Sequence, residues 1–125
     1  MKKVLLAEDT DIWIKTYKRL LIKQFGFSVV VAKNGKDAIN FINNETFDLV
    51  VCDHYMPGQT GNAVYAHIRK SDESKNKNVV FIHHSSMPCS YEYAESDDDK
   101  NFYIIPKDGD VHLITSLLEE LGFGD

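Results

Sequence analysis

The sequence predicts an α/β fold in which helices cover both faces of a doubly wound parallel sheet. Strand-like and helix-like patterns alternate along the whole chain, which is typical of parallel strands joined by right-handed crossovers. Residues 47–52 form an almost continuous apolar run, as expected of a strand buried on both faces. This run ends abruptly at Asp53. Because functional groups in open α/β sheets lie just beyond the carboxyl ends of strands, Asp53 is the first candidate functional residue.

The N-terminal elements follow from local patterns. Residues 3–7 and 28–32 are short apolar runs typical of strands. Between them, Thr10 or Asp11 can cap a helix that ends at Gly26. The apolar face expected for this helix consists of Ile12, Trp13, Thr16, Tyr17, Leu20 and Leu21.

The middle of the chain continues the alternation. The turn Asn34-Gly35 precedes a helix over 36–43, and the apolar strand over 47–52 follows. A further helix is expected over 62–69, and the charged connector over 70–78 is expected to be a solvated loop. The side chains that the helix over 36–43 is expected to bury are Ala38, Ile39 and Ile42.

The C-terminal part supplies the last two rounds of strand and helix. Strands are predicted over 79–84 and 101–105, with a weak helix candidate over 90–96 between them. A closing helix over 111–121 completes the pattern. Its apolar residues are Leu113, Ile114, Leu117, Leu118 and Leu121.

Composition limits the classes of function. A chain of 125 residues is one domain with a real core, so residues 1–125 are expected to carry no separate output domain. The net charge of −5 argues against nucleic acid or an anionic membrane as the main ligand. The apolar start is too short for a signal peptide or a membrane span, which predicts a cytoplasmic protein. Cys52 and Cys89 show no metal-type spacing, and neither a disulfide nor a structural metal is expected.

Three carboxylates are expected to converge at one edge of the sheet. Glu8 and Asp9 follow the first strand, and Asp53 follows the third. In a doubly wound sheet of order 2-1-3-4-5 these strands are neighbours. Like charges this close raise one another's pKa unless a cation joins them, and Mg²⁺ favours oxygen ligands while keeping positions open for phosphate. Asp11 lies nearby but is better explained as a helix cap.

A cationic and a hydroxyl group are expected at the same edge. Lys107 closes the fifth strand, and Ser85 or Ser86 closes the fourth. An ammonium group, a metal ion and a hydroxyl together complement the oxygens of a phosphoryl group. With Asp53 as the nucleophile, the product would be an aspartyl phosphate.

Over essentially its full length the chain resembles the receiver domains of two-component response regulators. The acidic pair Glu8-Asp9, the segment over 53–61, the hydroxyl after the fourth strand and Lys107 match that family's pattern in order. The resemblance implies a flavodoxin-like fold and makes Asp53 the phosphoacceptor. It also implies that Glu8, Asp9, Asp53 and the backbone carbonyl of Tyr55 bind Mg²⁺, that Lys107 pairs with the phosphoryl group, and that Ser85 is the switch hydroxyl.

The chain departs from the family pattern in several places. Two histidines, His83 and His84, precede Ser85, and Ser86 remains an alternative switch hydroxyl. Strand alternation places the two imidazoles on opposite faces, so they are not expected to share a metal. His54 is expected at the surface. The switch aromatic usually lies three residues before the lysine, where this chain has Ile104, with Tyr103 just upstream.

The function predicted is that of a phosphoacceptor in a two-component phosphorelay. A sensor histidine kinase or a histidine phosphotransfer protein would donate the phosphoryl group. Phosphorylation would then change contacts with a downstream protein target, so the chain would be a signalling switch rather than an enzyme in its main role. The alternative is an interaction module that works without phosphorylation, which the shifted aromatic and the histidine pair favour modestly. A phosphate ester hydrolase is a distant third, because Tyr55 stands where such enzymes place a second acid.

Overall fold

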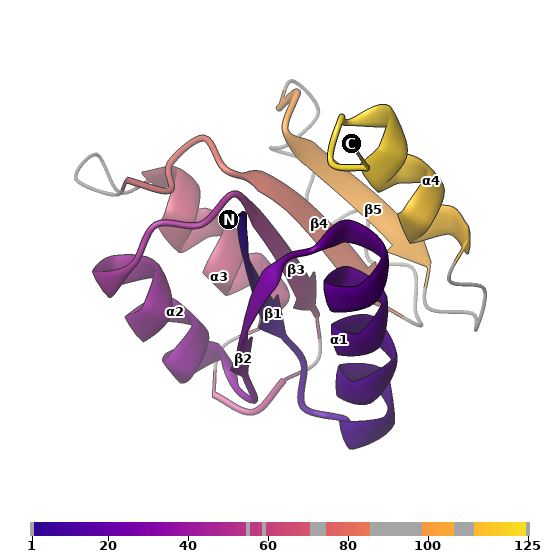
Figure 1. Cartoon of the computed structure of the whole chain (residues 1–125). Helices are drawn as coiled ribbons and strands as arrows, with labels where there is room; N and C mark the ends of the chain where they lie inside the picture. Colours follow the sequence, from indigo (N-terminus) through magenta and orange to yellow (C-terminus); the bar gives the residue numbers. More distant parts are fainter. Residues whose placement is uncertain are drawn as a thin grey trace.

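Five parallel strands form a single sheet in the order β2-β1-β3-β4-β5 (Figure 1). The computed structural model describes residues 2–54, 56–58, 60–70, 75–85, 99–106 and 112–124. The strands are β1 (Lys3–Ala7), β2 (Ser28–Ala32), β3 (Leu49–Asp53), β4 (Val80–Ser85) and β5 (Phe102–Pro106). The strand order and direction confirm the flavodoxin-like, doubly wound sheet that the sequence predicts.

Four described helices cover the two faces of this sheet. They are α1 (Asp11–Phe25), α2 (Gly35–Asn44), α3 (Gly61–Lys70) and α4 (His112–Glu120). The helices α2 and α3 lie on one face, and α1 and α4 lie on the other (Figure 1). None of the helices in the described part of the chain has the length and apolar character needed to cross a membrane.

Strand alternation gives each face its own hydrophobic core. Val50 and Cys52 of β3 pack with the residues of α2 and α3, whereas Leu49 and Val51 pack with those of α1 and α4. All five residues of β3 are buried, which explains the apolar run that predicts this strand. The last of them, Asp53, is therefore held at the edge of the sheet by a strand that is packed on both sides.

The helix ends follow the capping rules. Gly26 ends α1 in the left-handed conformation, with φ 71°, and its N–H donates a hydrogen bond to the carbonyl of Ile22. Asn34 caps α2 by accepting a 2.8 Å hydrogen bond from the backbone N–H of Asp37. Observed boundaries lie within two residues of the predicted ones for the described elements. The helix candidate over 90–96 falls outside the described residues.

The predicted inner face of α1 was wrong at its first residue. Ile12 is 69% exposed, whereas Ile14, which the prediction omitted, is buried with Tyr17 and Leu21. These three residues define the side of α1 that faces the core. Ile12 precedes Ile14 by two positions, which is about 200° around the helix, so it points to the opposite side.

The predicted solvated connector contains a buried polar anchor. Asn76 is 1% exposed, and its Oδ1 accepts a 2.8 Å hydrogen bond from the N–H of Phe47. Its Nδ2 donates to the carbonyls of Ile42 and Glu45 at 2.9 and 2.7 Å. One side chain therefore satisfies three backbone groups where the chain passes from α2 to β3.

Replacing Asn76 by alanine is expected to lower the free energy of unfolding by about 2–4 kcal/mol, because buried backbone groups lose their partners. The midpoint of urea denaturation measures this loss. Lys75→Ala, at the exposed neighbouring position, is the control and should change stability by less than about 0.5 kcal/mol. An Asn76→Ala protein as stable as this control would contradict the anchoring role.

The side chain of Asp99 is only 19% exposed and bonds to two residues of α3. Its Oδ2 accepts hydrogen bonds from the hydroxyl of Tyr65 at 2.6 Å and from Nε of Arg69 at 2.7 Å. Burial by itself would raise the pKa of the Asp99 carboxyl, but these hydrogen bonds and that from the N–H of Asn101 hold it below its ordinary value. Burial and the bond to Asp99 raise the pKa of Tyr65 to about 12. The cluster joins α3 to the residues that lead into β5.

Candidate functional site

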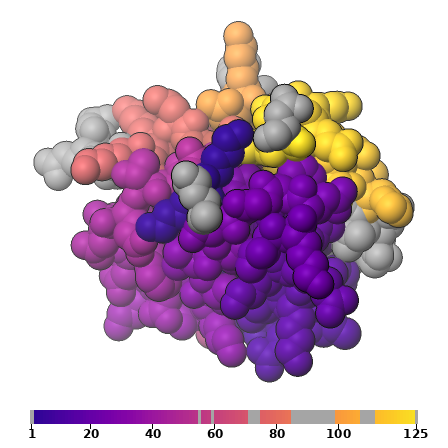
Figure 2. Space-filling view, viewed as in Figure 1, coloured from indigo at the N-terminus to yellow at the C-terminus, as the bar shows by residue number. Residues whose placement is uncertain are grey.

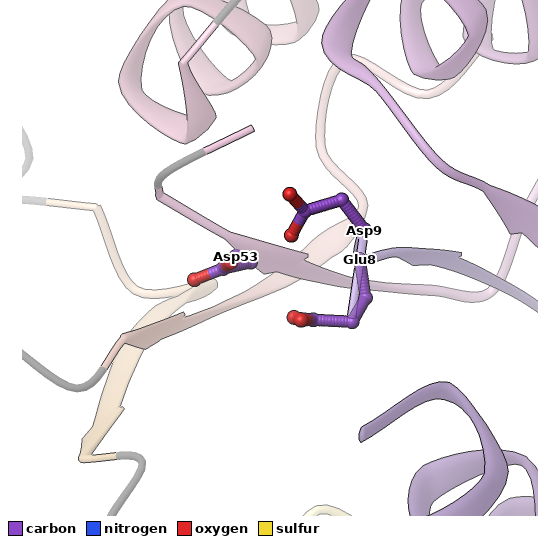
Figure 3. Close-up of side chains that lie close together, drawn as sticks. All are labelled: Glu8, Asp9 and Asp53. Carbon is purple, nitrogen blue, oxygen red and sulfur yellow. The ribbon is translucent and has the colours of Figure 1, made fainter. Parts of the chain in front are cut away.

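The carboxyl ends of β1 and β3 bring three acidic side chains together. Ala7 pairs with Cys52 in the parallel ladder, so the residues that follow, Glu8 and Asp53, leave the two strands side by side. A carboxylate oxygen of each of Glu8, Asp9 and Asp53 lies within 4.8 Å of the others. Figure 3 shows the three side chains gathered where the strands end. The convergence expected from the sequence is thus present.

The environment of these carboxylates suits a hard cation. Glu8 and Asp53 are 1% and 6% exposed, whereas Asp9 is exposed. Negative charges that are both buried and adjacent repel one another and lose hydration, and a cation or a shared proton relieves this. All three donors are oxygens, which fits Mg²⁺, and the exposed Asp9 leaves the site open to solvent.

Thr10 organises the two acids that precede it, a role that sequence reasoning missed. Its backbone N–H donates to Oε1 of Glu8 at 3.3 Å, and its hydroxyl donates to Oδ1 of Asp9 at 3.4 Å. Thr10 occupies the N-cap position of α1, but its side chain makes no capping hydrogen bond to the helix. A threonine between an acidic pair and a helix is the signal that could have indicated this arrangement.

Asp11 stands outside the acidic cluster. Its side chain is 77% exposed, and its Oδ1 lies 3.4 Å from Nζ of Lys33. Asp11 is the first residue of α1, where a negative charge is favourable near the positive end of the helix dipole. The interpretation of Asp11 as the helix cap was wrong, because the N-cap position belongs to Thr10 and Asp11 lies one residue inside the helix.

Gly61 allows the loop after Asp53 to pass close to the start of α3. Its N–H donates a 2.9 Å hydrogen bond to the carbonyl of His54. A Cβ atom at this position would lie 2.6 Å from the carbonyl oxygen of Asp53 and 2.9 Å from Cα of His54. Both contacts are with backbone atoms, so a side chain larger than hydrogen requires the backbone at Asp53 and His54 to move.

If Asp53 accepts a phosphoryl group as the sequence predicts, Gly61→Ala is expected to slow Mg²⁺-dependent phosphorylation at least about tenfold, because the backbone at Asp53 must shift. The same shift should destabilise the fold by about 1–3 kcal/mol. Labelling rates with a small phosphodonor and urea denaturation measure the two effects. Asn62→Ala, one residue further along α3, is the matched control. If Gly61→Ala matched this control in both measurements, the close approach would have no functional consequence.

The histidines near Asp53 are all buried, which corrects the surface position expected for His54. His54, His83 and His84 are 2%, 0% and 1% exposed, and the rings of His54 and His83 are 5.5 Å apart. Burial, together with the charge of His54, lowers the pKa of His83 to about 4. The acidic cluster of the described residues contains no imidazole ligand.

Cys52 is a buried hydrophobe rather than a reactive thiol. It is fully buried within the core under α2 and α3. Burial, assisted by the charges of Asp53 and Glu8, raises the pKa of its thiol. The thiolate required for nucleophilic chemistry is therefore strongly disfavoured.

Some of the predicted site residues lie outside the described structure. Tyr55, Ser86 and Lys107 are among them, as is the side chain of Ser85. The backbone of Ser85 ends β4, where it pairs with Pro106 of β5. The predicted hydroxyl position is therefore at the same edge of the sheet as Asp53.

The two candidates for the switch aromatic position face opposite ways. Ile104 is 43% exposed, whereas Tyr103 packs against the core under α1 and α4. The hydroxyl of Tyr103 donates a 3.2 Å hydrogen bond to the carbonyl of Lys100. Core packing and the hydrogen bond to Lys100, just before β5, therefore hold the side chain of Tyr103 in place.

Comparisons with known proteins agree with this geometry. The sequence profile of the response regulator receiver domain matches residues 4–118. Among curated relatives, the CAI-1 autoinducer sensor kinase/phosphatase CqsS of Vibrio cholerae is 27% identical over 113 residues, which is 90% of this chain and 16% of that protein. Histidine kinase 5 of Arabidopsis thaliana is 40% identical over 78 residues, which is 62% of this chain and 8% of that protein. The chain thus spans only a small part of these relatives.

Solved structures show the same likeness. The response regulator TrrA from Thermotoga maritima, in complex with Mg²⁺-BeF, is 26% identical with a TM-score of 0.79, and the match covers 97% of this chain and 99% of that one. The non-phosphorylated HemR receiver domain from Leptospira biflexa is also 26% identical, with a TM-score of 0.81 and coverage of 97% and 94%. Profile, fold and acidic cluster agree, and the chain belongs to the response regulator receiver domain family of two-component signalling.

Proposed function

We propose that this receiver domain accepts a phosphoryl group on Asp53 from a phosphohistidine, with Mg²⁺ held by Glu8, Asp9, Asp53 and the backbone carbonyl of Tyr55. The observation that carries the proposal is the meeting of three carboxylates at the ends of two adjacent strands. Mg²⁺-BeF in the related Thermotoga maritima regulator supports the choice of ion.

Each residue has a role in the transfer. An oxygen of the Asp53 carboxylate attacks phosphorus and the P–N bond to the donor imidazole breaks. The electron pair of that bond stays on the ring nitrogen, and because the other ring nitrogen already carries a proton, neutral imidazole leaves. Glu8 and Asp9 would hold the ion, which would supply positive charge beside the phosphoryl oxygens. Lys107 would pair with a phosphoryl oxygen, and the hydroxyl of Ser85 would donate a hydrogen bond to another.

Chemical mapping of the phosphorylated residue tests the proposal. The protein is incubated with acetyl phosphate and Mg²⁺, and the acyl phosphate is reduced with borohydride, which converts a phosphorylated aspartate to homoserine. Mass spectrometry should locate homoserine at position 53 and at no comparable level after Mg²⁺ is chelated. Modification at another residue, or equal modification without Mg²⁺, would overturn the proposal.

An interaction module independent of phosphorylation is not favoured. Such a module has no need to keep two nearly buried carboxylates beside an exposed third, an arrangement that is unfavourable without a cation.

We further propose that the phosphodonor docks on α1. A groove of about 530 Å³ runs along this helix, and its lining includes the apolar side chains of Ile12 and Leu20. Lys15, Arg19 and Lys23 add positive charge to the same groove. The α1 region lies at the molecular surface, at the lower right of Figure 2.

The charge of α1 indicates the chemistry of its partner. The helix contains Lys15, Lys18, Arg19 and Lys23 but only Asp11 as an acidic residue, although the chain as a whole carries −5. An amphipathic helix with acidic flanks therefore complements the groove in both shape and charge. Because α1 begins just after Asp9, such a helix would lie beside the phosphoacceptor.

Charge reversal in the groove is expected to separate docking from chemistry. Arg19→Glu with Lys23→Glu should slow transfer from a phosphohistidine protein about tenfold or more at low salt, but leave labelling by acetyl phosphate unchanged. Lys18→Glu, which reverses one charge on the same helix outside the groove, is the control for each of the single variants Arg19→Glu and Lys23→Glu. Equal transfer rates for these single variants and the control would place the donor elsewhere.

A further inference from the structure

A buried polar contact joins α1 to the end of β4. The hydroxyl of Tyr17 and Nε2 of His84 share a hydrogen bond, and the two residues are 3% and 1% exposed. Their rings meet edge to face with centroids 4.4 Å apart. Trp13 stacks on Tyr17 at 5.6 Å and meets His84 edge-on at 5.5 Å. We call these three residues the α1–β4 cluster.

The α1–β4 cluster lies directly beside the proposed phosphoacceptor. His84 is the register partner of Asp53 in the ladder between β3 and β4. Register partners on neighbouring strands are about 4.8 Å apart and project to the same face. His84 also immediately precedes Ser85. Through His84 the cluster is therefore next to Asp53 across the ladder and next to Ser85 along β4.

The composition of this face makes the contact unusual. On this face of the sheet, the other buried strand side chains in the core under α1 and α4 are aliphatic. They are Val4, Leu6, Leu49, Val51 and Ile82. Dispersion contacts between aliphatic side chains have no preferred direction, whereas a hydrogen bond depends on the distance and direction between its two partners. The bond between Tyr17 and His84 therefore fixes the end of β4 relative to α1.

We propose that Tyr17 and His84 are positioning residues that couple the phosphoacceptor site to α1. Their hydrogen bond fixes the end of β4, the strand whose last residue is Ser85. A displacement of Ser85 toward a phosphoryl group pulls on His84, and through Tyr17 it changes the surroundings of Trp13. This inference rests on the proposed function of Asp53 and adds a route to α1.

The fluorescence of Trp13, the one tryptophan in the sequence, reports this coupling. The protein is titrated first with Mg²⁺ and then with beryllofluoride, which mimics a phosphoryl group. Tyr17→Phe removes the hydroxyl and keeps the ring that stacks on Trp13. This variant should bind Mg²⁺ with a midpoint within about twofold of the wild type. Its fluorescence response to saturating beryllofluoride should fall to less than half, and its labelling by acetyl phosphate should slow several-fold.

A double-mutant cycle with His84→Val shows whether the two residues act through one contact. If the two residues act through one contact, the double variant Tyr17→Phe, His84→Val loses no more of the fluorescence response than the more affected single variant. His84→Gln keeps a polar partner for Tyr17, so its fluorescence response should be larger than that of His84→Val. An unchanged response and labelling rate in Tyr17→Phe would overturn the coupling, and so would fully additive losses in the cycle. Tyr17→Phe alone decides the matter if His84→Val does not fold.

The wild-type controls keep the two proposals apart. If the wild-type protein is labelled at Asp53 and binds beryllofluoride while Tyr17→Phe behaves identically, only the coupling fails. If the wild-type protein is labelled at no position and gives no beryllofluoride response, the proposed function fails, and the coupling fails with it.

Discussion

Replacement of Asp53 by asparagine is expected to abolish labelling by a small phosphodonor, because an amide oxygen is too weak a nucleophile to form the acyl phosphate. The same change removes one of three clustered negative charges. In the absence of Mg²⁺ the variant should therefore be more stable than the wild type by about 1–3 kcal/mol. Labelling with a phosphodonor and urea denaturation in the presence of a chelator measure the two effects.

The control for Asp53→Asn is Asp48→Asn, at the opposite end of the β3 region. Asp48 is exposed, and its Oδ2 accepts a 2.8 Å hydrogen bond from the N–H of Lys3. Asp48→Asn should be labelled at the wild-type rate. Equal labelling of Asp53→Asn and the wild type would reject Asp53 as the acceptor, and a loss of stability in chelator would contradict the repulsion within the cluster.

Asp9→Asn is expected to weaken Mg²⁺ binding about tenfold or more, which corresponds to about 1.4 kcal/mol. Asp9 is the exposed member of the cluster, so its replacement removes a charge from the mouth of the site without opening a cavity in the core. Phosphorylation at a fixed, subsaturating Mg²⁺ concentration should fall in parallel. Isothermal titration calorimetry measures the affinity directly.

Asp11→Asn provides a closely matched control for Asp9→Asn. It changes the same chemical group two residues further along, at a side chain that is exposed and lies outside the cluster. Its Mg²⁺ affinity should stay within about twofold of the wild type, since only a distant, solvated charge is lost. A larger loss of affinity in Asp11→Asn than in Asp9→Asn would mean that the ion is held by a different set of carboxylates.

The sheet and the meeting of the acidic residues could be predicted because both depend on simple rules. A continuous apolar run indicates a strand buried on both faces, and parallel strands end at the same edge of the sheet. Glu8, Asp9 and Asp53 therefore had to approach one another once their strands were neighbours. The predicted strands 3–7 and 28–32 agree with β1 and β2 at both ends.

The features that sequence reasoning missed depend on contacts between distant parts of the chain. Asn76 reads as part of a polar loop, and it is buried because backbone groups about thirty residues earlier need partners. His84 reads as a departure from a hydrophobic strand, and only the fold brings the hydroxyl of Tyr17 to it. His54 reads as a surface residue because it follows the end of a strand, yet it packs against His83.

A crystal structure of the protein with Mg²⁺ and beryllofluoride tests the central claim most directly. The account predicts an ion held by Glu8, Asp9, Asp53 and the backbone carbonyl of Tyr55, with its metal–oxygen distances at about 2.0–2.1 Å, and beryllofluoride attached to a carboxylate oxygen of Asp53. A structure grown with saturating Mg²⁺ in which the three carboxylates diverge, and no ion or beryllofluoride lies among them, would contradict it.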